Sequence, residues 1–138
     1  MKIDITDIAD LERFAKSFQQ KLEKGQVVYL HGDLGSGKTT LVQFIIKSFG
    51  YLNRVKSPTY NLYESYSIEE FEVIHMDLYR LANPEELFYL GIEDIFNSKN
   101  IVFIEWPEKG LGVLPKADFI LNLEIQTDSF RELSFIEN

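Results

Sequence analysis

The chain has 138 residues, 45% of them hydrophobic, no cysteine and a formal net charge of −8. This composition is typical of a single domain spanning 1–138, excludes disulfides and thiolate metal sites, and argues against direct nucleic-acid binding, which needs clustered lysine and arginine. Because no apolar stretch approaches the roughly 20 residues of a membrane-spanning helix and the first residues lack a secretory-signal pattern, we expect a cytoplasmic protein with no membrane partner.

The chain begins with a helical pattern. Apolar residues recur at three- and four-residue spacing from Ile8 to Leu22, which predicts one apolar helical face. Thr6 or Asp7 is available as the N-cap of this helix, and Gly25 is expected as the residue that ends it.

A strand, a loop and a second helix follow. Residues 26–31 form a β-rich run of the kind that is buried on both faces of a sheet. The pattern from Lys38 to Phe49 is helical again, and we expect Gly50 to end that helix. A glycine-rich segment separates the strand from the helix.

The middle of the chain predicts a hairpin and a helical segment. Two β-rich runs at 60–66 and 71–76 are separated by four residues, and a link this short implies antiparallel pairing. Pro84 is a favourable first helical residue and begins a segment that breaks near Gly91 and runs to about Phe96.

The last part of the chain is β-rich. Residues 101–104 predict another buried strand, and the alternation over 118–125 followed by a run at 130–136 predicts a closing hairpin with one largely solvated face. The sheet is therefore mixed. We expect an α/β, P-loop NTPase-like three-layer fold with a mixed parallel and antiparallel central sheet flanked by helices.

The segment from Gly32 to Thr39 reads Gly-Asp-Leu-Gly-Ser-Gly-Lys-Thr and points to phosphate chemistry. Its glycines let consecutive backbone N–H groups curl around a phosphate, with a helix N-terminus behind them. Lys38 is expected to reach the β- and γ-phosphates, and the Thr39 hydroxyl is expected to bind Mg²⁺. The loop residues assigned to the nucleotide are Asp33, Gly35, Ser36, Gly37, Lys38, Thr39 and Thr40.

Two acidic residues end predicted strands. Glu105 is the candidate Walker B acid, which would hold Mg²⁺ together with Thr39. Asp77 ends its strand in the same way and either competes for the metal or orients the attacking water. Trp106 adjoins Glu105 and is expected to contact the nucleotide site.

Other residues near these motifs leave their roles open. Pro58 holds Thr59 in a defined loop, which suits either a switch hydroxyl near the γ-phosphate or a turn that begins a strand. Arg80 is either an arginine finger or a surface residue. We assign His31 and His75 no role, because each is expected to pack inside the sheet.

Taken together, these motifs resemble the bacterial TsaE family, formerly YjeE, whose members are ATPases that act in making threonylcarbamoyladenosine beside the anticodon of certain tRNAs. The resemblance spans nearly the whole chain. The segments that carry it are 32–40, 57–60 (Ser-Pro-Thr-Tyr), 75–80 (His-Met-Asp-Leu-Tyr-Arg), 84–87 with Gly91, and 104–107 (Ile-Glu-Trp-Pro).

The resemblance implies roles for individual residues and a preference for ATP. Thr39 and Glu105 would hold magnesium, Asp77 would support hydrolysis, and 57–59 would sense the nucleotide. Ser36 stands where many members have alanine. The residues assigned as catalytic are Lys38, Asp77 and Glu105. Outside the glycine-rich loop, the residues assigned to the nucleotide are Thr6, Thr59, Trp106 and Arg131.

The resemblance also implies partners. Members look like weak ATPases alone and act on two partner proteins, the threonylcarbamoyl transferase TsaD and its paralogue TsaB, so that tRNA is reached only through the complex. ATP hydrolysis would drive a conformational cycle there. Two alternatives stay open: a small-molecule kinase, and a non-catalytic nucleotide-dependent assembly module. The kinase is disfavoured because the region after Glu105 contains no arginine until Arg131, whereas such kinases carry an arginine-rich lid.

Overall fold

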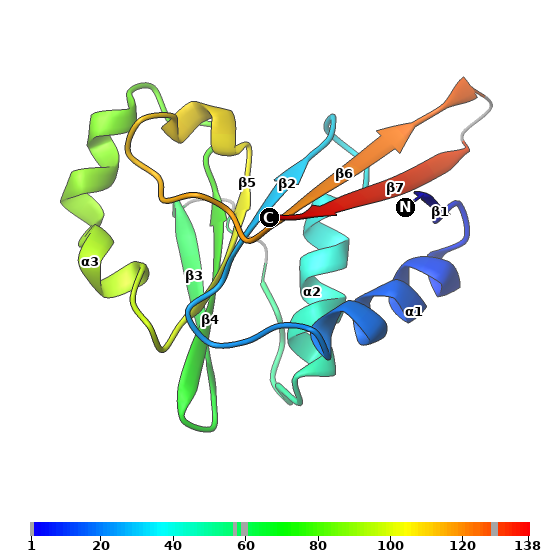
Figure 1. Ribbon diagram of the computed structural model, residues 1–138, viewed down its shortest axis with the longest axis horizontal. Coiled ribbons are helices and arrows are strands. Elements are labelled where there is room, and N and C mark those ends of the chain that lie inside the picture. Colours follow the sequence, from blue (N-terminus) through cyan, green and yellow to red (C-terminus); the bar gives the residue numbers. More distant parts are fainter. Residues whose placement is uncertain (1, 57, 59–60, 128–129) are drawn as a thin grey trace.

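The computed structural model describes residues 2–56, 58, 61–127 and 130–138. Within these residues, seven strands form one sheet in the order β1-β7-β6-β2-β5-β4-β3. Strands β6, β2, β5 and β4 run parallel, and the outer strands pair antiparallel, as Figure 1 shows. The strands are β1 (Lys2–Asp4), β2 (Val27–His31), β3 (Tyr63–Ile68), β4 (Phe71–Asp77), β5 (Ile101–Glu105), β6 (Phe119–Ile125) and β7 (Arg131–Glu137).

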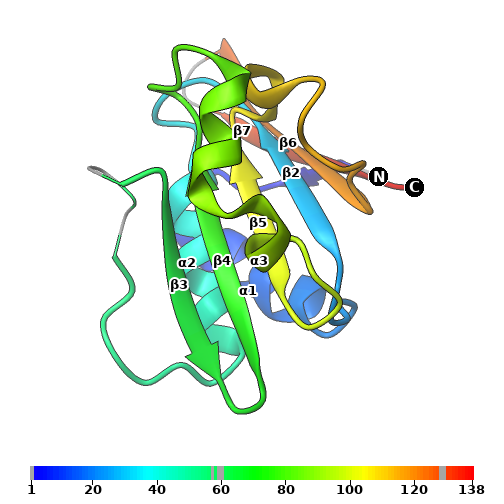
Figure 2. The ribbon, with the colours of Figure 1, turned by 90° about the vertical axis from the view of Figure 1, so that its left-hand side faces the viewer.

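Helices cover both faces of the sheet. The α-helices α1 (Ile8–Gln19) and α2 (Lys38–Ser48) lie on one face. The 3₁₀-helix η1 (Pro84–Leu90), the α-helix α3 (Ile92–Ile95) and the 3₁₀-helix η2 (Pro107–Gly110) lie on the other, in front of β4 and β5 in Figure 2. None of the helices in the described ranges is long and apolar enough to cross a bilayer. The expected three-layer α/β fold with a mixed sheet is confirmed.

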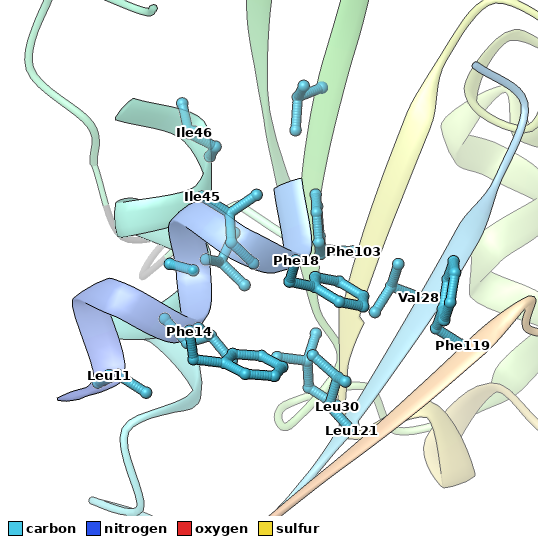
Figure 3. Close-up of a cluster of buried hydrophobic side chains, with 14 of the residues drawn as sticks. Leu11, Phe14, Phe18, Val28, Leu30, Ile45, Ile46, Phe103, Phe119 and Leu121 are labelled. Carbon is cyan, nitrogen blue, oxygen red and sulfur yellow. The ribbon is translucent and has the colours of Figure 1, made fainter. Parts of the chain in front are cut away.

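Alternate residues of the central strands contribute to two separate hydrophobic cores, one on each face of the sheet. On β5, Phe103 points to the helices α1 and α2, whereas Ile104 packs among the residues under η1 and α3. Figure 3 shows the first core, where Phe18 of α1 meets Phe119 of β6 edge to face with ring centroids 5.1 Å apart. Full burial of such a ring stabilises the fold by about 1.5–3 kcal/mol. These cores fix α2, and with it the glycine-rich loop, against the strand ends.

The first helix is shorter than its apolar pattern predicts. Asp7 caps it, and the Asp7 carboxylate accepts a hydrogen bond from the backbone N–H of Ala9 at 3.1 Å. The expectation that Gly25 ends this helix is wrong, because α1 stops at Gln19 and the chain continues in turns. Gly25 has a positive φ of 89° and donates its N–H to the Asn100 carbonyl. It therefore belongs to the turn that leads into β2. Leu22 extends the apolar pattern because it packs on the core from the turn.

The β-rich predictions hold with shifted boundaries. Strands β3 and β4 form the expected antiparallel hairpin, although β3 begins at Tyr63 rather than at residue 60, which lies outside the described residues. Strands β6 and β7 form the closing hairpin, and Phe119, Leu121 and Leu123 make its buried face. The short strand β1 was not predicted, since three residues carry too little alternation to be recognised.

The segment after Pro84 breaks where expected. Asn83 caps it through a hydrogen bond from the Glu85 N–H, and the Glu86 carboxylate accepts the Asn83 N–H at 2.8 Å, which completes a capping box. Gly91 then adopts a left-handed conformation, with φ of 73°, between η1 and α3. The first part of the segment is a 3₁₀-helix, which its sequence alone does not distinguish from an α-helix.

Candidate functional site

The glycine-rich loop connects β2 to α2 and wraps the N-terminus of α2. Gly37 caps that helix in a left-handed conformation, with φ of 107°. At Gly32 a Cβ atom would lie 2.6 Å from both the Leu123 carbonyl oxygen and the Ser36 hydroxyl oxygen, so a side chain does not fit there. The loop is thus held close to β6, with the backbone N–H groups at the start of α2 available for an anion.

The acidic strand ends meet the loop at one edge of the sheet. Strands β4 and β5 are parallel neighbours in which Asp77 and Glu105 are register partners, and Glu105 is also the register partner of Leu30 on β2. A cavity of about 230 Å³ opens at this edge. Its lining residues are Leu34, Gly35, Ser36, Gly37, Lys38, Thr39, Thr40, Asp77, Glu105, Trp106 and Arg131.

Ten of the residues predicted from the sequence therefore line one cavity, and two of the other described ones, Asp33 and Thr6, do not. Asp33 lines a separate hollow of about 360 Å³ together with His31 and Glu124. Thr6 lies outside the cavity lining, and Thr59 lies outside the described residues. Arg80 is exposed and does not line the cavity, which fits a surface residue better than an arginine finger.

The two expected magnesium ligands lie in direct contact. The Thr39 hydroxyl lies 3.1 Å from Oε1 and 2.8 Å from Oε2 of Glu105. Glu105 is only 2% exposed, so its carboxylate is held among protein groups rather than in bulk water. A hydroxyl and a carboxylate are hard oxygen donors of the kind Mg²⁺ takes while keeping several waters, so these two residues fit that ion.

Glu105 has a second partner that the sequence did not suggest. His75 is fully buried, as expected for a residue inside the sheet, but its Nε2 lies 2.5 Å from Glu105 Oε2. Side chains two residues apart on a strand point to the same face of the sheet, so His75 and Asp77 project from the same face of β4. This two-residue spacing is the one feature of the sequence that could have pointed to His75. The same expectation for His31 is wrong, since its side chain is 37% exposed and lies 3.8 Å from Glu108.

Lys38 is buried against aromatic and backbone groups. Its Nζ donates to the Gly32 carbonyl and lies 3.9 Å from the centroid of the Trp106 ring. Burial lowers the pKa of Lys38, and the nearby carboxylates of Glu105 and Asp77 oppose that shift. Trp106 presents its ring in this way from a left-handed backbone conformation, with φ of 57°. Trp106 therefore lies at the cavity beside the lysine of the glycine-rich loop, and its predicted contact with a nucleotide stays a prediction.

Asp77 occupies a different environment from Glu105. Burial raises the pKa of Asp77, and a hydrogen bond of 3.0 Å from the Tyr79 N–H to its carboxylate lowers it. The charge of Glu105 adds to the rise, whereas His75 and Lys38 counter it. A carboxylate whose charge is disfavoured in this way is a better proton acceptor than an ordinary aspartate.

Arg131 reaches the cavity from the hairpin at the other side of the loop. Its backbone N–H donates to the Thr6 hydroxyl at 2.9 Å, and its carbonyl accepts the Ile5 N–H at 2.9 Å. Thr6 therefore holds the start of β7, from which the Arg131 side chain lines the cavity. Within the described residues, the buried Ser36 hydroxyl has no hydrogen-bond partner, and the Ser36 N–H donates to the Asp33 carbonyl at 3.1 Å.

Comparison with known proteins shows which family the chain belongs to. The sequence profile described as "Threonylcarbamoyl adenosine biosynthesis protein TsaE" matches residues 5–133. The chain belongs to the TsaE family. This family takes part in the biosynthesis of threonylcarbamoyladenosine in tRNA, and the resemblance seen in the sequence motifs is confirmed.

Relatives from two bacteria carry the same family name. The chain is 48% identical to the tRNA threonylcarbamoyladenosine biosynthesis protein TsaE of Haemophilus influenzae over 130 residues, which cover 91% of this chain and 82% of that protein. It is 39% identical to the TsaE of Rickettsia felis over 130 residues, covering 94% of this chain and 75% of that protein. The crystal structure of YdiB from Bacillus subtilis has the same fold, with a TM-score of 0.77 at 23% identity over 99% of this chain and 84% of that one.

Proposed function

We propose that this TsaE-family chain is a single-domain, Mg²⁺-dependent ATPase subunit that supports threonylcarbamoyladenosine modification of tRNA next to the anticodon. One observation carries the proposal. The Thr39 hydroxyl lies 2.8 Å and 3.1 Å from the two carboxylate oxygens of Glu105, in a cavity that the glycine-rich loop lines. A loop that binds only an anion would not need a buried carboxylate beside it, whereas a nucleotide with Mg²⁺ does.

The start of α2 and four side chains of the cavity then have defined tasks. The N–H groups at the start of α2 and the ammonium of Lys38 bind the phosphates, and Thr39 and Glu105 hold Mg²⁺, which when bound neutralises charge on the phosphate oxygens. The Glu105 carboxylate contacts two protein side chains, whereas the Asp77 carboxylate accepts only the Tyr79 N–H among the described residues. We therefore assign Glu105 to the metal and Asp77 to the attacking water, from which it accepts a proton or a hydrogen bond.

The partners follow from the family. We propose that the chain acts in the cytoplasm on the transferase TsaD and its paralogue TsaB, and that it reaches tRNA only through them. The formal charge of −8 supports an indirect contact with tRNA, because an acidic chain is repelled by a phosphate backbone. The transfer chemistry itself would then reside in the partner rather than in this chain.

The test is ATP turnover by the purified chain with Mg²⁺, alone and with the two partner proteins. Lys38→Ala is the blank, and Glu105→Gln separates turnover from binding. We expect weak turnover alone, strong stimulation by the partners, and loss of turnover but retained folding in Glu105→Gln. A Glu105→Gln chain that still supports tRNA modification would indicate an assembly module, and a phosphorylated metabolite among the products would indicate a kinase.

A further inference from the structure

A buried histidine lies beneath the proposed metal ligand. Among the described residues, the buried polar or charged ones are Ser36, Lys38, His75, Asn100 and Glu105. Ser36 and Lys38 belong to the glycine-rich loop, and the Asn100 side chain donates to two carbonyls at the end of α3. His75 is the strand residue in this set with no task assigned so far. Burying an imidazole is unfavourable unless it is hydrogen-bonded, so its partner indicates its purpose.

That partner is one oxygen of Glu105. His75 Nε2 lies 2.5 Å from Oε2, whereas Nδ1 has no hydrogen-bond partner in the part of the chain that the structure describes. An ionised carboxylate only accepts hydrogen bonds, so Nε2 is the nitrogen that carries the proton. The contact is a charge-assisted hydrogen bond between side chains that are 0% and 3% exposed, and low exposure strengthens such bonds.

The arrangement restrains the Glu105 carboxylate. Val73, His75 and Asp77 share one face of β4, and His75 is the register partner of Phe103 on β5, two residues before Glu105. The imidazole therefore lies below the carboxylate, and Thr39 approaches it from α2. His75 therefore contacts Oε2 from within the sheet, while Glu105 also lines the cavity at the end of β5.

We infer that His75 is a positioning residue, which fixes the Glu105 carboxylate as a magnesium ligand by donating from Nε2 to Oε2. The inference rests on the proposed function and adds to it the group that orients the ligand. Hydrogen-bonded partners behind metal ligands set the ligand's orientation, and their removal lowers metal affinity by about 10–100-fold.

The experiment uses two substitutions of similar volume that differ in the donor. In His75→Gln the side-chain amide takes the place of Nε2, whereas His75→Met fills the space without a donor. We expect His75→Met to weaken Mn²⁺ or Mg²⁺ binding to the ATP complex by about 10–100-fold, measured by Mn²⁺ electron paramagnetic resonance and by calorimetry. His75→Gln should recover most of that affinity. ATP binding in EDTA should be unchanged in both, and His31→Met should bind the metal as the unaltered chain does.

A second measurement starts from the unaltered chain and does not depend on a His75 variant folding. The chain has two histidines, so long-range ¹H–¹⁵N spectra of the nucleotide-free protein resolve each imidazole. We expect a protonated Nε2 for His75 and a change in its ¹⁵N signals in Glu105→Gln. A His75 imidazole protonated at Nδ1 alone, or His75→Met with unaltered metal affinity, would overturn the inference. If instead Mg²⁺ did not affect ATP binding by the unaltered chain, the proposed function would fail first and take this inference with it.

Discussion

Thr39 and Glu105 are joined by a hydrogen bond across two secondary-structure elements, from the first turn of α2 to the end of β5, with the hydroxyl 2.8 Å from Oε2 and 3.1 Å from Oε1. The two groups that we assign to Mg²⁺ are therefore held together by the fold itself. Removing the hydroxyl by Thr39→Val should weaken Mg²⁺ binding to the ATP complex by about 10–100-fold. This loss of affinity corresponds to the free energy of one polar interaction with a charged group. Calorimetric titrations of ATP with Mg²⁺ and with EDTA measure this.

Thr39→Ser is the matched control for that prediction, because serine keeps the oxygen and removes only the methyl group. It should bind Mg²⁺ nearly as the unaltered chain does. Equal metal affinity in Thr39→Val and Thr39→Ser would show that the hydroxyl is not a ligand.

Trp106 should report nucleotide binding. It is the only tryptophan in the sequence, and the Lys38 ammonium lies 3.9 Å from the centroid of its ring. Phosphates that attract this ammonium change the charge next to the indole, so tryptophan emission should change on titration with ATP. The midpoint should match the dissociation constant from calorimetry. Lys38→Ala should remove the signal, and Lys116→Ala should keep it; emission that stays constant while calorimetry detects binding would refute the assignment.

The sequence was sufficient to place the glycine-rich loop and the two acids at one site because their signals are local, whereas the assignment of Arg131 comes from the family resemblance. A strand, the segment from Gly32 to Thr39 and a helix follow each other directly, so the loop's place at the sheet edge follows from chain order. The acids Asp77 and Glu105 each end an apolar run, and the carboxyl ends of parallel strands meet at that same edge.

What the sequence did not provide are relationships that depend on register and tertiary contacts. The bond between His75 and Glu105 requires the pairing of β4 with β5, which no local pattern encodes. Asp33 lies within the glycine-rich segment in sequence, yet it lines a different hollow. The end of α1 was misplaced because Leu22 continues the apolar period from a turn, where packing rather than helical periodicity accounts for it.

Tyr66 anchors the backbone just before the Ser57-Pro58-Thr59 segment. Its hydroxyl accepts the Lys56 N–H at 2.9 Å and donates to the Lys56 carbonyl at 2.8 Å, and the residue is 3% exposed. Tyr66→Phe removes both bonds and should lower the free energy of unfolding by about 1–3 kcal/mol at pH 8, measured by urea denaturation. Tyr29→Phe serves as a control that leaves Lys56 untouched.

Tyr66 should also make the free energy of unfolding depend on pH. Burial raises the pKa of Tyr66 above its ordinary value of about 10, so the folded state keeps the phenol proton after the unfolded state has lost it. The resulting stability is fully present below pH 10 and is lost as the pH rises through the folded-state pKa. The stability difference between the unaltered chain and Tyr66→Phe should therefore shrink above pH 10. A constant difference would show that the pKa of Tyr66 is the same in the folded and unfolded chains, so that burial does not raise it.

Gly32 should be the glycine of the loop that tolerates substitution least, because a side chain there would clash with its neighbours. A Cβ atom there would lie 2.6 Å from the Leu123 carbonyl oxygen, which is backbone and cannot rotate away. Gly35→Ala meets no atom within 4 Å and carries only the strain of its φ of 79°, about 1–2 kcal/mol. Gly32→Ala should lose clearly more stability than Gly35→Ala in urea denaturation of the nucleotide-free chain, because β6 or the loop must shift. Adding Ser36→Ala to Gly32→Ala removes the second close contact, also 2.6 Å, and should recover only part of the loss. Full recovery would place the conflict in the serine side chain and not in the backbone of β6.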